Sequence, residues 1–182
     1  MAFEREELLQ KLTFAIAMNP GITMTELAKT TAISKASLHR IYSTKENLLE
    51  IILQRTKVFY SGISELLTKE HEDFMEDLKA VIAAFCDNRA YVLFITRDIF
   101  TDLIKNSDWE RYDKEMEDFF YEGQKRGFLS KDFTAGTMVN VFLGIVTWLL
   151  CMSIEKNTPE SEIQETILRI LLNGIGAKSS SN

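Results

Sequence analysis

Basic and hydroxyl side chains gather in one short stretch of this chain, between residues 25 and 45. From Lys29 to Lys45 the sequence contains bases and no acid, although the whole chain of 182 residues has a net charge of −6. Lysine and arginine bind phosphate oxygens and guanine edges, and hydroxyl groups hydrogen-bond to phosphates. A basic patch on an acidic protein therefore predicts an anionic partner, and duplex DNA fits this chemistry.

Two short predicted helices carry these residues. The first begins near Thr25, and Glu26 stands three residues after Thr23, which is the spacing of a capping box. A tight turn follows, and Ser34 caps a second helix over residues 35–42. Two helices joined by a turn of about three or four residues form a helix-turn-helix, whose second helix enters the major groove of DNA.

The side chains of these two helices divide between an inner and an outer face. The apolar positions at helical spacing, which we expect to pack inward, are Leu27, Ala28, Ile33, Leu38 and Ile41. The set expected to face outward and to read the groove is Lys35, Ser37, His39 and Arg40. The other interpretation of these charges is an ordinary solvated surface.

Three runs of residues follow one another in this region. They read Met-Thr-Glu-Leu-Ala at 24–28, Thr-Ala-Ile-Ser-Lys-Ala-Ser-Leu-His-Arg-Ile-Tyr at 31–42 and Ser-Thr-Lys-Glu-Asn-Leu-Leu at 43–49. Residues 8–52 thereby resemble the TetR family of transcriptional regulators. The sequence departs from the family pattern at His39, where Tyr is usual, and at Ala32 and Ala36, where Gly is usual.

The resemblance implies a set of DNA contacts. Its phosphate contacts are Thr25, Ser34, Tyr42 and Lys45. Its recognition-helix members are Lys35, Ala36, Ser37, His39 and Arg40. A second pattern, Glu122-Gly123 followed by Gly127-Phe128-Leu129, resembles the family's entry to its dimerisation helices.

Helical spacing continues along the rest of the chain. Only 8 Gly and 2 Pro are present, and this scarcity of turn residues favours long helices over sheets. We predict an all-α fold of about nine helices. It comprises an N-terminal three-helix helix-turn-helix domain over residues 1–48, a larger helical bundle over 49–176 that binds ligand and dimerises, and a disordered Ser-rich tail over 177–182.

The resemblance also implies a small-molecule effector that enters the C-terminal bundle and releases DNA. The candidate ligand-binding residues are Phe59, Phe94, Trp109, Tyr112, Met116, Phe120 and Asn140. Most are aromatic or apolar, so the effector is expected to be largely apolar. The same stripes are also what a packed core requires, and both interpretations stay open here.

The last two predicted helices carry more apolar residues than one subunit needs. The expected dimer contacts are Val141, Gly144, Ile145, Trp148, Ile163, Ile167, Ile170, Leu171 and Gly174. Pairing these helices with their copies would form a four-helix interface of a homodimer. The other interpretation is that both helices cover their own core. A two-fold dimer would bind an inverted repeat in DNA.

Other functional classes fit the sequence less well. Its two histidines stand apart and its two cysteines are isolated, so we predict no catalytic set, no metal site and no cofactor. The longest apolar run, residues 139–152, is interrupted by polar residues and is shorter than the ~20 residues of a membrane span. We therefore expect a cytoplasmic protein without a membrane partner.

The sequence as a whole favours a dimeric repressor that a small ligand releases from an inverted-repeat operator, and not an enzyme. The alternative is a helical protein-interaction adaptor, or a small-molecule-binding protein, that does not bind DNA. Salt-dependent binding to duplex DNA distinguishes the two.

Overall fold

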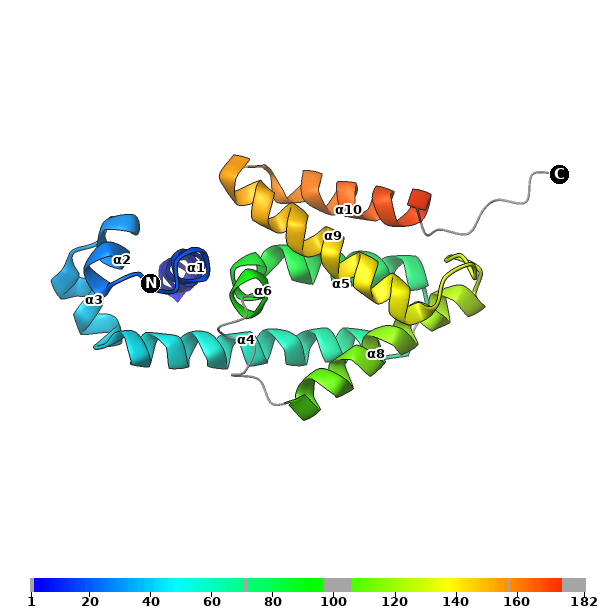
Figure 1. Cartoon of the computed structure of the whole chain (residues 1–182), viewed down its shortest axis with the longest axis horizontal. Helices are drawn as coiled ribbons and strands as arrows, with labels where there is room; N and C mark the ends of the chain where they lie inside the picture. Colours follow the sequence, from blue (N-terminus) through cyan, green and yellow to red (C-terminus); the bar gives the residue numbers. More distant parts are fainter. Residues whose placement is uncertain (1, 71, 97–105, 157, 175–182) are drawn as a thin grey trace. The chain divides into compact units, whose positions relative to one another are not determined.

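The computed structural model describes residues 2–70, 72–96, 106–156 and 158–174, and the regular structure in these ranges is entirely helical (Figure 1). The helices are α1 (Ala2–Met18), α2 (Met24–Thr30), α3 (Lys35–Tyr42), α4 (Lys45–Thr68), α5 (Phe74–Asp87), α6 (Arg89–Ile95), α8 (Asn106–Lys125), α9 (Ala135–Lys156) and α10 (Glu160–Gly174). The predicted all-α fold is confirmed.

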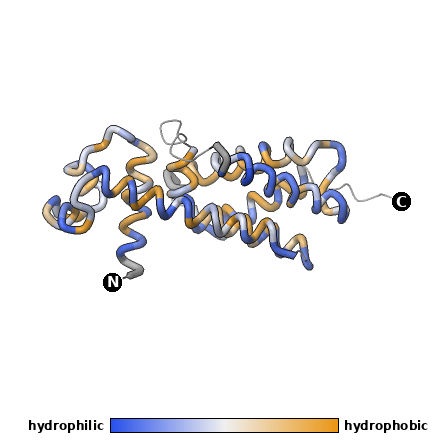
Figure 2. The backbone as a smooth tube through the Cα atoms, turned by 90° about the horizontal axis from the view of Figure 1, so that it is seen from below, coloured by the Kyte–Doolittle hydropathy of each residue, from blue (hydrophilic) through white to orange (hydrophobic). Residues whose placement is uncertain are grey.

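Most of these helices are amphipathic. Figure 2 shows hydrophobic and hydrophilic patches interspersed along the helical backbone. In α5 the apolar positions recur at helical spacing, and Leu78, Val81 and Phe85 are buried. Burying such a side chain stabilises the fold by about 1.5–3 kcal/mol, so this stripe fixes which face of the helix turns inward.

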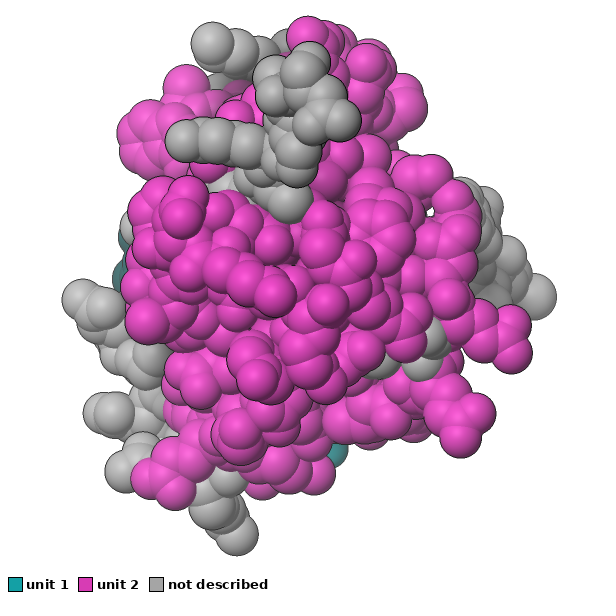
Figure 3. Space-filling model, turned by 90° about the vertical axis from the view of Figure 1, so that its right-hand side faces the viewer, with its two compact units in different colours: residues 1–60, 88–103 teal, residues 61–87, 104–182 magenta. Residues whose placement is uncertain are grey.

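The chain divides into two compact units, which Figure 3 colours separately. Unit 1 contains Met1–Tyr60 with Asn88–Leu103, and unit 2 contains Ser61–Asp87 with Ile104–Asn182. Unit 1 therefore adds α6 and the first part of α4 to the predicted N-terminal helices. The domain boundary at residue 48 stays a prediction, and the predicted tail over 177–182 lies outside the described residues.

In unit 1 the helix α6 lies against α1 and is buried from Ala90 to Ile95. A hydrogen bond joins the same two helices, since Tyr91 Oη donates to Glu6 Oε1 at 2.7 Å. Arg55 of α4 reaches the other carboxylate oxygen of Glu6 at 3.3 Å. The packing and this polar cluster together join α1, α4 and α6, which support the two short helices α2 and α3.

In unit 2 an aromatic cluster forms where α5 meets the end of α8. Phe74 stacks on Phe119 at 5.0 Å and on Phe128 at 5.4 Å between ring centroids. Gly123 makes this packing possible, because a Cβ atom there would lie 2.3 Å from Phe74 Cζ. Gly127, with φ +79°, ends α8 in a Schellman motif, in which Phe128 N–H donates to the Gly123 carbonyl at 3.0 Å.

Helix α9 is unusually apolar and only partly covered. Its segment Ala135–Ser153 has a mean hydropathy of 1.8 and 28% of it is buried. By length and composition this segment could cross a bilayer, which corrects the expectation that the apolar run is too short and too polar. The apolar core helix of a soluble protein has the same composition, so this feature does not make α9 a membrane span.

Candidate nucleic-acid interface

The capping box predicted for α2 is present. Thr23 is the N-cap, its Oγ1 accepts from Glu26 N–H at 3.3 Å, and its own N–H donates to Glu26 Oε2 at 2.8 Å. The backbone and side-chain hydrogen bonds from Thr23 hold the pKa of Glu26 below its usual range. The first turn of α2 is therefore fixed, and Thr25, in that turn, is exposed to solvent.

The turn between α2 and α3 contains a strained residue. Ala32 has φ 56°, in the left-handed region that costs a residue with a Cβ about 1–2 kcal/mol. This explains why glycine is usual at that position of the resembled family. The turn closes through Ile33 N–H, which donates to the Ala28 carbonyl at 3.1 Å.

The N-terminus of α3 presents hydroxyl groups. Ser34 is the N-cap, and its Oγ accepts from Ser37 N–H at 3.0 Å while donating to Ser37 Oγ at 2.9 Å. The backbone N–H groups of the first helical turn, at Lys35 and Ala36, have no intrahelical partner. Such groups attract phosphate oxygens, so this end of α3 suits an anionic surface.

The predicted outer face of α3 is exposed. Lys35, Ala36, His39 and Arg40 are exposed and Ser37 is half-buried, whereas Leu38 is fully buried beneath them. His39 Nδ1 lies 2.7 Å from the Ser43 carbonyl. Because a carbonyl can only accept, Nδ1 carries the proton, and Nε2 is left for a further contact.

Lys45 begins α4 and is half-buried. Its Nζ donates to the Pro20 carbonyl at 2.7 Å, which ties the start of α4 to the turn after α1. Lysine has three N–H donors, so this bond leaves two for a phosphate. The Asn19-Pro20-Gly21 turn thus helps to position a predicted phosphate contact.

Tyr42 does not fit the predicted role of a phosphate contact. Its side chain is 2% exposed, and its hydroxyl group is inaccessible to solvent. Tyr42 lies one turn after Leu38 on α3, and both side chains are buried. Position 42, which the resemblance assigned to phosphate binding, is therefore a core position, and a phosphate cannot reach this hydroxyl in the structure.

Two residues on this surface were not among the individual contacts predicted from the sequence, although Lys29 begins the basic stretch. Thr44 caps α4, since its Oγ1 accepts from Asn47 N–H at 3.2 Å. Lys29, at the end of α2, is exposed within the acid-free stretch. A hydroxyl residue directly before a helical run would have identified Thr44, and charge alone would have added Lys29.

The predicted ligand-binding residues fall into both units. Phe59 and Phe94 are buried in unit 1, whereas Tyr112, Met116 and Phe120 are buried in unit 2 and Trp109 is half-buried there. Phe120 packs on Phe142 with 5.5 Å between ring centroids. Asn140 is exposed and does not share their burial. The aromatic stripe is thus core packing at least in part.

The predicted dimer residues also separate into two groups. Ile163, Ile167 and Leu171 are buried, and their helix α10 packs on α5 and α9 of the same unit. The exposed members are Val141, Gly144, Trp148, Ile170 and Gly174, with Ile145 half-buried. Trp148 is 66% exposed, which is unusual for the largest apolar side chain.

Among the described residues, no three His, Cys, Asp or Glu side chains lie close enough to hold a metal ion. The polar groups on or next to α2, α3 and the start of α4 are mostly hydroxyls, amines and a guanidinium, with the His39 imidazole and the carboxylates of Glu26 and Glu46 beside them. This set can bind phosphates and base edges and offers no nucleophile with a paired base.

Comparison with known proteins shows a similarity to transcriptional regulators in both sequence and fold. No protein-family model matches the chain. The chain is 25% identical over 173 residues to the HTH-type transcriptional regulator NfxB of Pseudomonas aeruginosa, covering 93% of this chain and 92% of that protein.

Two solved structures illustrate the similarity in fold. The TetR-like transcriptional regulator LfrR from Mycobacterium smegmatis superposes with a TM-score of 0.71 at 17% identity, covering 96% of this chain and 98% of LfrR. A transcriptional regulator from Saccharomonospora viridis, solved in complex with choline, gives a TM-score of 0.60 at 16% identity over 98% of this chain and 100% of its own.

Proposed function

The chain has the fold of the TetR-family transcriptional regulators, and from this premise we propose that it is a dimeric, sequence-specific DNA-binding repressor. The observation that carries the proposal is the acid-free stretch from Lys29 to Lys45, whose exposed side chains include Lys29, Lys35, His39 and Arg40. On this surface the N-terminal turn of α3, the Ser34 side chain and the side chains of Lys35 and Arg40 are open to solvent, and Ser37 is half-buried.

The DNA-binding step follows from this surface. The first turn of α3 approaches a phosphate through its free N–H groups, with Thr25, Ser34 and Lys45 as further phosphate contacts. Lys35, Ser37, His39 and Arg40 then face base edges in the major groove. Arginine and lysine donate to guanine O6 and N7, so these two residues are expected to contribute most to base preference.

Dimerisation is supported by the partly covered helix α9. Val141, Gly144, Ile145 and Trp148 recur at intervals of three and four residues, so they form one stripe on a helix. Exposed apolar stripes of this kind are normally buried against a partner. A second copy supplies a matching stripe through two-fold symmetry, which places two α3 helices on an inverted repeat.

The proposed effector is a small, largely apolar molecule that binds among the buried aromatic residues of α8 and stabilises one arrangement of the dimer over another. It can release DNA only through a difference in its affinity for the two arrangements. The cytoplasm is the compartment in which such a regulator acts.

A pair of substitutions tests the DNA-binding assignment. Lys45→Ala is expected to weaken binding to all duplexes and to reduce the slope of log affinity against log salt by about one. Arg40→Ala is expected to cost about 1–3 kcal/mol and to relax preference at one base pair. Lys57→Ala removes the same charge from another lysine of α4, which is exposed, and is the control for net charge.

The outcome separates the repressor from the alternative of a helical adaptor that never binds DNA. An adaptor shows no salt-dependent affinity for any duplex. If all three variants bind DNA as the parent does, the contact assignment fails even though the fold is retained.

A further inference from the structure

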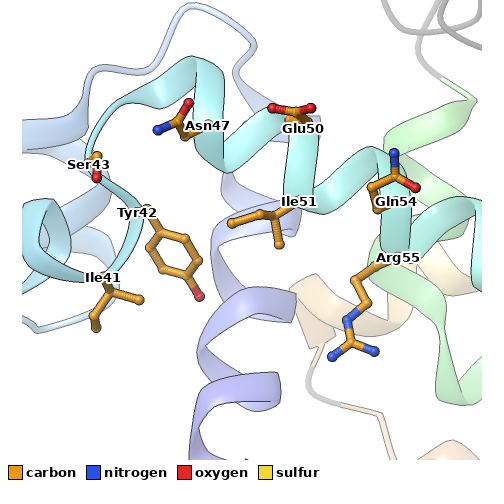
Figure 4. Close-up of a pocket in the computed structure, with 8 residues that line it drawn as sticks. All are labelled: Ile41, Tyr42, Ser43, Asn47, Glu50, Ile51, Gln54 and Arg55. Atoms are coloured by element: carbon orange, nitrogen blue, oxygen red, sulfur yellow. The ribbon is translucent and has the colours of Figure 1, made fainter.

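Two hydrogen bonds join His39, in the second turn of α3, to Ser43, the residue that ends this helix. Ser43 N–H donates to the His39 carbonyl at 2.8 Å, and His39 Nδ1 donates to the Ser43 carbonyl at 2.7 Å. Ser43 lies in the connection between α3 and α4 and lines the groove shown in Figure 4. The imidazole ring of His39 is therefore fixed to the end of its own helix.

The backbone at Ser43 is strained. Ser43 has φ 59° and ψ −68°, and Thr44 N–H donates to the Tyr42 carbonyl at 2.7 Å. These values describe a γ-turn with positive φ, which is the rare and strained form of this turn. Because ψ of Ser43 sets the direction of its carbonyl group, the turn places a hydrogen-bond acceptor beside His39 Nδ1. Strained residues cluster at functional sites, so the contact between this turn and the ring points to a role for the ring.

The bond to Ser43 decides which ring nitrogen of His39 carries the proton. A neutral imidazole has one N–H donor and one acceptor nitrogen. The Ser43 carbonyl can only accept, so Nδ1 has the proton and Nε2 has the lone pair. His39 is exposed, and within the described part of the chain its ring makes no hydrogen bond through Nε2. Neutral His39 thus presents an acceptor to solvent.

This acceptor differs from the charged side chains around it. Lys35, one turn earlier on α3, and Arg40, the next residue, have donors only, so they can bind phosphate oxygens and the acceptor atoms of guanine. Nε2 of His39 cannot bind either of these, because both are acceptors. The donors in the major groove are the exocyclic amino groups, at N6 of adenine and N4 of cytosine. Tyrosine, which is usual at this position of the resembled family, has a hydroxyl that can donate, so His39 changes the chemistry of the contact.

We propose that His39 is a specificity-determining residue, whose Nε2 accepts a hydrogen bond from the exocyclic amino group of adenine or cytosine in the major groove. This role rests on the proposed function, since α3 must lie in the groove. Lysine and arginine select guanine, whereas His39 selects the bases that carry an amino group. At one position of each half-site, adenine or cytosine is then preferred over guanine or thymine on the same strand.

The position of the ring proton is measured first, in the full-length protein without DNA. Proton–nitrogen correlation spectra of the imidazole at pH 8, above the range in which histidine ordinarily titrates, distinguish a protonated ring nitrogen from one with a lone pair. We expect a proton on His39 Nδ1 and none on Nε2. The chain has one other histidine, His71, and the spectrum of His39→Ala assigns the two sets of signals.

Selection of bound sequences from a random duplex pool at pH 8 then locates the contact. The parent should enrich adenine or cytosine at one position of each half-site, and His39→Ala should accept all four bases there. His39→Lys, which replaces the acceptor with donors, should enrich guanine at the same position. Arg40→Ala is the matched comparison on α3, because it should relax a different base pair and keep the preference for an amino group at this one.

Deletion of the amino group tests the hydrogen bond itself. In the selected duplex, purine replaces adenine or 2-pyrimidinone replaces cytosine at the position located by the selection, and each analogue lacks only the amino group. The affinity of the parent should fall about fivefold more than that of His39→Ala, as expected for one hydrogen bond. The loss that both proteins share reports the weakened base pair, so only the excess belongs to His39.

Several results overturn the proposal while leaving the DNA-binding assignment intact. They are a proton on His39 Nε2 in the free protein, an enriched inverted repeat that His39→Ala leaves unchanged, and equal losses of the two proteins when the amino group is deleted. A parent that prefers guanine or thymine at the position relaxed by His39→Ala also overturns it. A folded parent that enriches no sequence refutes the proposed function together with the role of His39.

Discussion

The helix-turn-helix and the α9–α10 pair differ in how their structure is determined. In the first, local hydrogen bonds fix each helix end, with Thr23 capping α2 and Ser34 capping α3. In the second, long apolar helices pack on one another, and Trp148 remains 66% exposed. The first region presents a polar surface with capped helix ends, whereas the second presents an apolar surface that its own unit covers only in part. We propose that duplex DNA binds the first region and that a second copy of the chain covers the second.

The largest expected effect concerns the apolar surface. Trp148→Glu should raise the dissociation constant of the proposed dimer at least about 30-fold, because a large aromatic at an interface typically contributes about 2 kcal/mol or more. Sedimentation equilibrium over a range of protein concentrations measures this change.

Tyr121→Glu is the control for that measurement, because it places the same charge at an exposed aromatic of α8. It should leave association unchanged. A parent protein that is monomeric at all concentrations, or a Trp148 variant that still dimerises normally, would show that α9 is not the interface.

The next effect concerns packing inside unit 2. Gly123→Ala should destabilise the protein by about 1–3 kcal/mol, because its Cβ would lie 2.3 Å from Phe74 Cζ and 2.8 Å from Leu129 Cδ1. Urea unfolding at one fixed protein concentration measures the difference. Gly62→Ala is the matched change in α4, where a Cβ meets nothing within 4 Å. It should be neutral or stabilise the helix by about 0.5–1 kcal/mol. Equal effects of the two substitutions would contradict the role given to Gly123.

A smaller effect tests the capping of α2. Thr23→Ala should cost about 1 kcal/mol at neutral pH, since it removes the side-chain half of the capping box. Glu26 has a lowered pKa in the folded state, so its contribution is present above its unfolded pKa of 4.5 and is lost as pH falls through the lower folded value. The difference between parent and variant should therefore shrink in acid.

Thr25→Ala is the control for the cap, because Thr25 lies inside α2 and caps nothing. Thermal unfolding at pH 7 and pH 3 measures both variants. If the stability difference between Thr23→Ala and the parent is the same at pH 7 and pH 3, Glu26 does not contribute to the cap.

The smallest expected effect is a gain in stability when the strained residue Ala32 is replaced. Ala32→Gly should stabilise the protein by about 0.5 kcal/mol, because relief of the left-handed strain exceeds the entropy that glycine loses on folding. Ala36→Gly makes the same chemical change inside α3 and should destabilise by up to about 1 kcal/mol. Equilibrium unfolding in urea measures the change in the free energy of unfolding for each variant. If both variants change it in the same direction, Ala32 is not strained.

The two regions also differ in how far the sequence could predict them. The capping box, the Ser34 cap and the exposed face of α3 depend on neighbours within four residues, so spacing identified them. Tyr42 could not be placed in this way, because helical spacing does not say whether an aromatic at a helix end turns toward solvent or core. Its burial is a tertiary property.

The apolar residues of α9 and α10 show the same limit. Periodicity predicted both helices, yet Ile167 is buried against its own unit and Trp148 is not. Nothing in the local pattern distinguishes a side chain that covers its own core from one that covers a partner.

We propose that the surface of α2, α3 and the start of α4 binds duplex DNA sequence-specifically. Selection of bound sequences from a random duplex pool, carried out with the parent and with Arg40→Ala at two salt concentrations, tests this proposal. We expect one inverted-repeat sequence for the parent, weaker binding at the higher salt, and relaxed preference at one base pair in each half-site for the variant. Failure of the folded, dimeric parent to enrich any sequence at either salt concentration would contradict the claim.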